Sequence, residues 1–165
     1  MSKKIAAGSD AILLDVTVGS GAFMKNLTDA RLLAQTMVDL GNAVGRKTVA
    51  VITDMRQPLG ATIGNRLEIA ESLTVLQGGG SPELRQFIAE LAQIMLGLAG
   101  VEKSVDAILE NLSNGTALDK FKQIIQAQDG DLEELLASPE HVTVFSKTVV
   151  SSQAGYVTSF DALTA

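Results

Sequence analysis

Cysteine and tryptophan are absent from this 165-residue chain, and aromatic residues make up only 4% of it. Without cysteine, the chain can form neither a disulfide nor a thiolate metal site. The single histidine, His141, has no metal-ligand companion, so we interpret it as a surface residue in a polar turn. No basic run exceeds two residues and the formal net charge is −6. Since nucleic-acid surfaces need basic patches and stacking platforms, we expect small molecules or another copy of the chain as partners.

Long apolar segments are also missing. No apolar run approaches the roughly 18 residues needed to span a bilayer. The lysines at positions 3 and 4 are not followed by the uninterrupted apolar region of a signal peptide, because residues 8–10 are polar or glycine. The chain is 46% hydrophobic and 19% charged, which is typical of a globular protein. The cytoplasm is therefore the expected compartment.

The first third of the chain has the pattern of a strand–helix–strand unit. Residues 11–18 are almost continuously apolar, as in a strand that is covered on both faces. Apolar residues then recur at helical spacing over residues 27–44, with Asn26 or residues 28–29 as the cap. Residues 48–52 form a second β-branched run. Short turns on both sides predict a parallel crossover, so we expect an α/β fold with flanking helices.

The rest of the chain is mostly helical in pattern. After a loop at residues 55–60, helices are predicted over five segments, at residues 62–77, 82–99, 101–111, 118–127 and 131–136. From residue 142 the character changes, and β-branched runs at residues 142–145 and 147–150 predict two strands. Two strands with nothing after them would leave their edges unpaired. We therefore expect this last part to begin another domain.

A small-residue turn, residues 19–22, follows the first strand. Ligands of open α/β sheets lie outside the carboxyl ends of the strands, which makes this turn a candidate site. The glycine pattern is only a partial dinucleotide motif, because Met24 stands where the third glycine should be. No acidic residue occupies a convincing ribose position after the second strand. We interpret the turn as a tight connection that packs beneath a substrate cleft.

Several motifs together resemble one enzyme family. They are Ser-Lys-Lys at residues 2–4, the segment at residues 14–24, Thr-Asp-Met at residues 53–55, Gln-Pro-Leu-Gly at residues 57–60, Ile-Gly-Asn at residues 63–65 and Gly-Tyr-Val at residues 155–157. In this combination the chain resembles the pyrimidine-nucleoside phosphorylases, a family that includes thymidine phosphorylase, over essentially its whole length. One departure is Thr17, where family members commonly have lysine. Any charge role of that position is therefore in doubt.

The resemblance implies a place within a longer protein. Residues 1–138 resemble the later half of the large α/β domain, and residues 139–165 resemble the hinge and the start of a C-terminal α+β domain. The implied reaction is reversible phosphorolysis of uridine or thymidine to the free base and a (deoxy)ribose 1-phosphate. The family also implies a homodimer. Because its phosphate loop lies outside this sequence, we expect the isolated chain to lack measurable phosphorolysis.

The resemblance also assigns four residues. Lys3 matches the lysine that contacts the pyrimidine base, where an ammonium can donate to a base carbonyl and favour negative charge on the leaving base. Leu59 and Thr62 match main-chain carbonyl ligands of a monovalent cation, potassium, and Glu71 matches its carboxylate ligand. The family's remaining ligands lie outside this sequence, so we expect no tightly held ion in the isolated chain. No catalytic residue is assigned.

Two alternatives belong to other classes. The first is an enzyme similar to anthranilate phosphoribosyltransferase, which the Ser-Lys-Lys motif and the loop at residues 54–64 argue against. The second is a non-catalytic α/β module. An assay for phosphorolysis of uridine or thymidine separates these readings, and the preference between the two nucleosides is left open.

Overall fold

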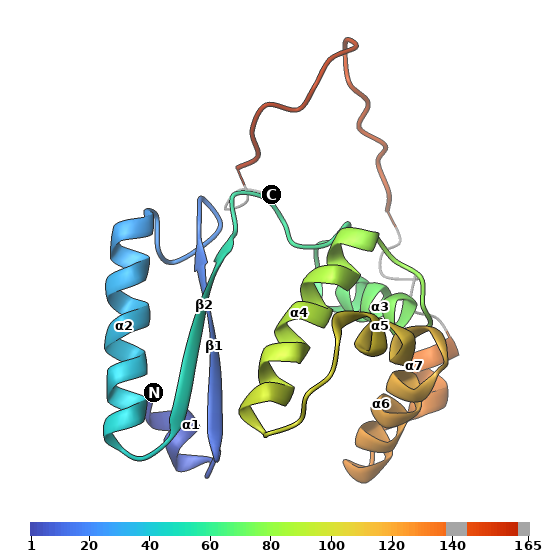
Figure 1. The fold of residues 1–165 in the computed structure, drawn as a ribbon. Coiled ribbons are helices and arrows are strands. Elements are labelled where there is room, and N and C mark those ends of the chain that lie inside the picture. The colour runs from blue at the N-terminus through green and yellow to red at the C-terminus, as the bar shows by residue number, and fades with distance from the viewer. Residues whose placement is uncertain (138–144, 162–165) are drawn as a thin grey trace. The chain divides into compact units, whose positions relative to one another are not determined.

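The computed structural model describes residues 1–137 and 145–161. Its helices and strands, in chain order, are α1 (Ser2–Ala6), β1 (Ala11–Val18), α2 (Leu27–Ala43), β2 (Lys47–Asp54), α3 (Asn65–Leu76), α4 (Pro82–Leu98), α5 (Val105–Ser113), α6 (Thr116–Ala127) and α7 (Leu132–Ala137) (Figure 1). The chain divides into two compact units. The first consists of Met1–Leu59, Leu91–Lys103 and Val157–Ala165, and the second of Gly60–Glu90 and Ser104–Tyr156.

The first unit contains a two-stranded parallel sheet. The register pairs Ala11 with Lys47 at one end and Val18 with Asp54 at the other. Both strands therefore end at the same edge, where the turn after β1 and the segment after β2 lie together. This confirms the predicted α/β class and the parallel arrangement.

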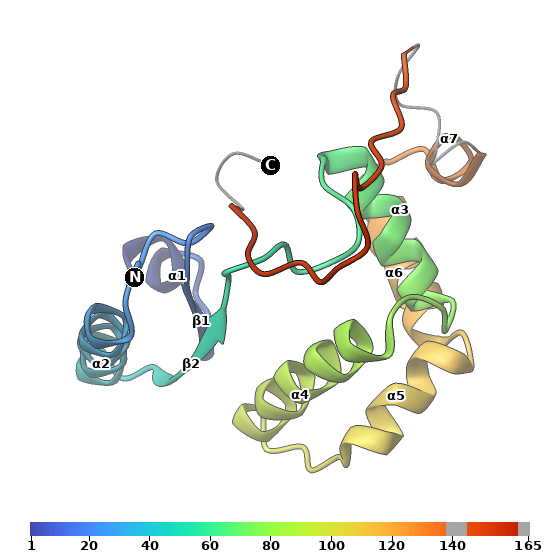
Figure 2. The same ribbon diagram turned by 90° about the horizontal axis from the view of Figure 1, so that it is seen from above.

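The core of the first unit lies between the sheet and α2. Alternate residues of β1 point to one face, and Ile12, Leu14 and Val16 are all buried there. Figure 2 shows α2 against this face of the sheet. Ala30 and Ala34 face the strands from α2, and their small side chains let the helix approach closely. Each buried aliphatic side chain of this kind stabilises the fold by about 1.5–3 kcal/mol.

Both ends of α2 are defined by short-range contacts. The Asn26 side chain accepts a hydrogen bond from the Asp29 N–H at 2.9 Å, which identifies Asn26 as the cap that the sequence left open. At the other end, Gly45 adopts φ +74° and its N–H donates to the Asn42 carbonyl. A left-handed glycine directly after a helix satisfies the last carbonyls and turns the chain towards β2.

Within the described residues, the second unit contains helices only up to residue 137, and residues 145–156 have no regular secondary structure. Its core contains Val75, Leu84 and Leu112, which come from α3, α4 and α5, and α5 also packs on α6. The Ser81 hydroxyl caps α4 by accepting the Leu84 N–H at 3.1 Å, as its sequence indicates. This cluster of buried residues is therefore small, with one aliphatic side chain from each of α3, α4 and α5.

Some predicted boundaries are wrong. The helix expected over residues 101–111 begins at Val105, because the Ser104 side chain accepts the Ala107 N–H and caps it there. The helix expected from residue 62 begins at Asn65. The short helix α1 was not predicted, because five residues are too few to show helical periodicity.

The C-terminal strands are only partly covered by the structure. Residues 145–150 have no regular secondary structure, so the strand predicted over residues 147–150 is wrong. A strand needs a hydrogen-bonded partner, and none of the described residues pairs with this segment. Residues 142–144, His141 and the predicted boundary at residues 138–139 lie outside the described residues. In the part of the chain that the structure describes, we find no helix that is long and apolar enough to cross a bilayer.

Candidate functional site

The turn after β1 is fastened to the segment after β2 by backbone hydrogen bonds. The Gly19 N–H donates to the Met24 carbonyl and the Gly21 N–H donates to the Met55 carbonyl, both at 3.0 Å. The Met55 N–H in turn donates to the Val18 carbonyl at 2.7 Å. The Ala22 N–H also donates, to the Gly19 carbonyl, so three N–H groups of the turn are already bonded to the protein. This confirms the tight connection that the sequence predicts, and its place beneath a substrate cleft stays a prediction.

Glycine is required at position 19. Gly19 adopts φ +146°, and a Cβ atom there would collide with the backbone of Met55 and Arg56. A side chain would push these two segments apart. The close approach of the turn after β1 to the segment after β2 thus depends on Gly19.

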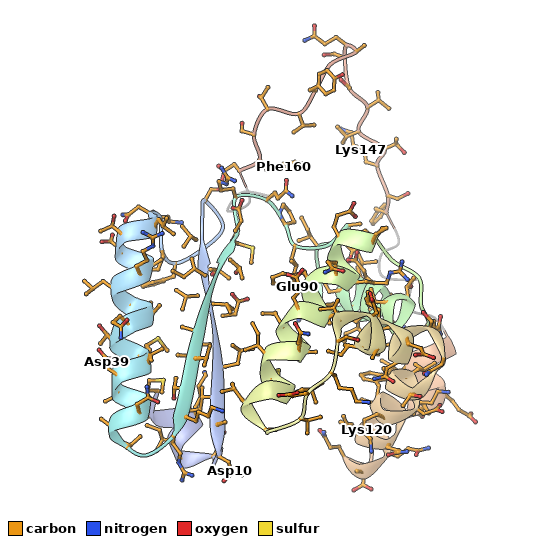
Figure 3. The ribbon with its side chains drawn as sticks, in the orientation of Figure 1. Asp10, Asp39, Glu90, Lys120, Lys147 and Phe160 are labelled. Atoms are coloured by element: carbon orange, nitrogen blue, oxygen red, sulfur yellow. The ribbon has the colours of Figure 1, made fainter. Side chains whose placement is uncertain are left out.

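A cleft of about 530 Å³ opens at this edge of the first unit. It is lined by Ser20, Asp54, Arg56, Gln57 and residues 157–160. Figure 3 shows Phe160 near the carboxyl ends of the strands, and the Ser20 hydroxyl donates to its carbonyl at 3.4 Å. Residues 157–160 contribute two apolar side chains, Val157 and Phe160, and two hydroxyls, and this mixture with the amide and the ion pair suits a small polar ligand.

An ion pair between Asp54 and Arg56 lies in this cleft, and sequence reasoning missed it. The Arg56 guanidinium donates to the Asp54 carboxylate at 2.6 Å through Nη2 and at 2.9 Å through Nε, and the Arg56 backbone N–H adds a further bond. The hydrogen bonds from the Arg56 side chain lower the pKa of the Asp54 carboxyl and raise that of the guanidinium. An Asp-x-Arg pattern directly after a strand could have indicated this pair.

Lys3 lies at the opposite end of the first unit. It belongs to α1, which is next to the start of β1 rather than its end (Figure 1). Its side chain is exposed and makes no hydrogen bond or ion pair with any of the residues that the structure describes. The structure therefore does not bring Lys3 together with the glycine turn. Its role as a base contact stays a prediction.

Thr62 and Glu71 are brought together in the second unit. The Glu71 carboxylate is half-buried and accepts the Ala61 N–H at 2.8 Å on Oε1. Its other oxygen accepts the Thr62 hydroxyl at 2.7 Å and the Thr62 N–H at 3.2 Å. The hydrogen bond from Ala61, followed by that from the Thr62 hydroxyl, lowers the pKa of Glu71. Glu71 is therefore ionised at neutral pH.

The chemistry of these groups fits a hard cation. Glu71 supplies an ionised carboxylate. Gly60 has no Cβ, so its backbone can lie directly against this carboxylate. Within residues 1–137 and 145–161 no three His, Cys, Asp or Glu residues gather, so an ion here would depend on backbone oxygens. Leu59, the third predicted ligand, belongs to the first unit, and its side chain is 55% exposed. Only its carbonyl could serve as a ligand.

Thr17 faces away from α2, on the side of the sheet that carries Asp15. It pairs in register with Thr53, whose hydroxyl donates to the Asp15 carboxylate at 2.6 Å. A neutral hydroxyl thus satisfies the carboxylate at this face.

The fold thus combines a parallel α/β unit with a cleft at the carboxyl ends of its two strands. Residues 1–118 match the family described as "Glycosyl transferase family, a/b domain", and the chain belongs to this family. It is 47% identical over 163 residues to the thymidine phosphorylase of Mycobacterium tuberculosis strain ATCC 25618 / H37Rv. It is 46% identical over 164 residues to the pyrimidine-nucleoside phosphorylase of Staphylococcus aureus strain NCTC 8325 / PS 47.

These alignments cover 99% and 96% of this chain, respectively. In contrast, they cover only 37% and 38% of the two relatives. The chain therefore spans well under half the length of the curated relatives that it matches. The segments of similarity include the strand–turn–helix and the Glu71 region.

Proposed function

We propose that these residues belong to a pyrimidine-nucleoside phosphorylase, a pentosyltransferase that acts on uridine or thymidine. The observation that carries the proposal is the identity of 46–47% to two phosphorylases along nearly the whole chain. In the reaction the bond between the sugar C1′ and the base nitrogen breaks, and a phosphate oxygen forms a bond to C1′. The base departs with the electron pair, so groups that stabilise its negative charge accelerate the reaction.

Within this proposal Lys3 contacts the base. Its exposed ammonium, with no partner among the described residues, can donate to a base carbonyl and offset the developing charge. The geometry of the structure does not supply this role, which rests on the resemblance of the Ser-Lys-Lys motif. A homodimer and a cytoplasmic location belong to the same proposal.

A potassium ion at Glu71 is a further part of the proposal. The Glu71 carboxylate and the main-chain carbonyls of Leu59 and Thr62 would hold it, because hard cations take oxygen ligands. When bound, the ion would supply a fixed positive charge beside the loop ahead of α3. The half-buried, ionised state of Glu71 supports this assignment.

A chimera tests the proposed activity. The 163-residue stretch of the M. tuberculosis thymidine phosphorylase that aligns with this chain would be replaced by the residues of this chain. We expect the chimera to release thymine or uracil only when phosphate is present. A chimera that folds, as its circular dichroism and unfolding midpoint show, but releases no base would contradict the proposal. The same assay separates it from an enzyme similar to anthranilate phosphoribosyltransferase and from a non-catalytic module.

A further inference from the structure

The Glu71 carboxylate accepts hydrogen bonds from the turn that precedes α3. Three hydrogen bonds, from two backbone N–H groups and one hydroxyl, converge on its two oxygens at 2.7–3.2 Å. The donors lie nine and ten residues earlier in the chain, before α3 begins. Hydrogen bonds to an ionised acceptor are about twice as strong as neutral ones. The contact is therefore a strong link between a helix and the turn that leads into it.

Gly60 lets the turn close around this carboxylate. A Cβ atom at position 60 would lie 2.8 Å from the Glu71 Cδ and 2.9 Å from Oε1, well inside van der Waals contact. The Gly60 backbone does not have a positive φ, so a side chain here would act only through space, by displacing the flexible end of the Glu71 side chain. The turn thus wraps the carboxylate on three consecutive residues.

A second carboxylate on the same helix fixes the next part of the chain. The Gly64 N–H donates to Glu68 Oε1 at 3.0 Å, and Gly64 adopts φ +122° at the start of α3. Glu68 and Glu71 are three residues apart and thus lie on neighbouring positions of one helix face. They bind different amides, which makes Glu68 a matched control for Glu71.

We propose that Glu71 is a loop-positioning residue that holds residues 60–62 against α3 by itself, without a bound ion. The three donors would otherwise have to be satisfied by water, since the carboxylate is their acceptor in the fold. This inference goes beyond the proposed function, which gives Glu71 only the role of a cation ligand. It implies that the turn bearing Thr62 is already in place before any ion arrives.

Amide hydrogen exchange, followed by NMR on the 165-residue chain in potassium-free choline chloride buffer, tests the proposal. We expect the Ala61 and Thr62 amides to be protected, and Glu71→Gln to accelerate their exchange at least tenfold. In the glutamine variant one carboxylate oxygen is replaced by an NH₂ group. This group cannot accept a hydrogen bond from Ala61 or Thr62, so the three bonds cannot all form. The Gly64 amide should be unaffected by this change.

Matched variants separate a local effect from general destabilisation. Glu68→Gln should accelerate exchange at Gly64 but leave Ala61 and Thr62 protected. Thr62→Val should accelerate exchange at Ala61 and Thr62 because it removes the hydroxyl donor, whereas Thr62→Ser keeps a hydroxyl and should preserve protection. If Glu71→Gln fails to fold, the Thr62 pair still decides the question.

Adding potassium chloride distinguishes this proposal from the cation site. Protection of Ala61 and Thr62 that appears only with potassium would overturn the positioning role and leave the cation site standing. Protection that is already present in choline chloride would support the positioning role, and it would leave the cation site to be tested separately by a potassium-binding measurement. Absence of protection under both conditions would overturn the positioning role.

Discussion

The two units of this protein fix their functional loops by different means. In the first unit, the turn after β1 is held by bonds between backbone groups and by a hydroxyl donor from Ser20 and an ammonium donor from Lys25, both to carbonyls, with Gly19 allowing the close approach. In the second unit, the turn before α3 is held by the side chain of Glu71. Backbone bonds do not titrate and survive most substitutions, whereas a carboxylate can be protonated or replaced. The first loop should therefore be sensitive to steric change and the second to charge.

The largest effect on this comparison should come from Gly19→Ala. The Cβ atom would collide with the backbone of Met55 and Arg56 at a φ that non-glycine residues rarely adopt. We expect a loss of about 3 kcal/mol in the free energy of unfolding of the first unit, since strain and overpacking each cost about 1–3 kcal/mol. Urea denaturation monitors this change.

Gly97→Ala is the matched control for this substitution. Gly97 lies in α4, has no positive φ, and a Cβ there meets nothing within 4 Å. Alanine should therefore be neutral or stabilising by about 0.5–1 kcal/mol. Equal effects of the two substitutions would show that the close approach at Gly19 does not hold the first loop.

Lys3→Ala should have the next largest effect, on catalysis and not on folding. In the active chimera we expect kcat/KM for phosphorolysis to fall at least tenfold, about 1.4 kcal/mol of transition-state stabilisation. Its neighbour Lys4, exposed on the same short helix, provides the control Lys4→Ala, which should retain the rate. An unchanged rate for Lys3→Ala would remove the base contact from the account.

Acidification should loosen only the second loop. The pKa of Glu71 is lowered from its ordinary value of 4.5, so its bonds stabilise the turn above that value and are lost as the pH falls through the lowered pKa. Amide protection at Ala61 and Thr62, corrected for intrinsic exchange, should decline in that range. Protection at Gly21 and Met55, whose acceptors are carbonyls, should persist. A parallel decline at all four amides would contradict the difference between the units.

The smallest effect should come from Arg56→Ala. Its ion pair with Asp54 is exposed, and such pairs contribute little to stability because water screens them. We expect no measurable shift in the unfolding midpoint. NMR titration should show the pKa of Asp54 rising towards its ordinary value of 3.8 once the guanidinium is gone. A marked loss of stability would mean that the Asp54–Arg56 ion pair helps to hold the first loop.

The parallel strands could be predicted because their signal is local and strong. Residues 11–18 are almost continuously apolar, and the helix that follows keeps its period for four turns. The start of α5 was missed because Val101 continues an apolar pattern, while the Ser104 cap decides the boundary. A single capping residue thus decides where this helix begins, although the apolar spacing starts a few residues earlier.

The arrangement around the candidate sites was harder to predict. The pairing of Thr62 with Glu71 depends on the path of a loop, which neither residue's identity reveals. The family resemblance named both residues but gave no hint that they bond to each other. For Lys3 the resemblance alone supplies the role, since α1 lies beside the start of β1.

The most direct test of the central claim is a phosphorus NMR spectrum of the chimera's reaction with uridine or thymidine and inorganic phosphate. Phosphorolysis predicts a pentose 1-phosphate signal that grows as the phosphate signal falls, in step with release of the base. Base release with an unchanged phosphate signal would indicate hydrolysis and contradict the account. So would a folded chimera that leaves both nucleoside and phosphate untouched.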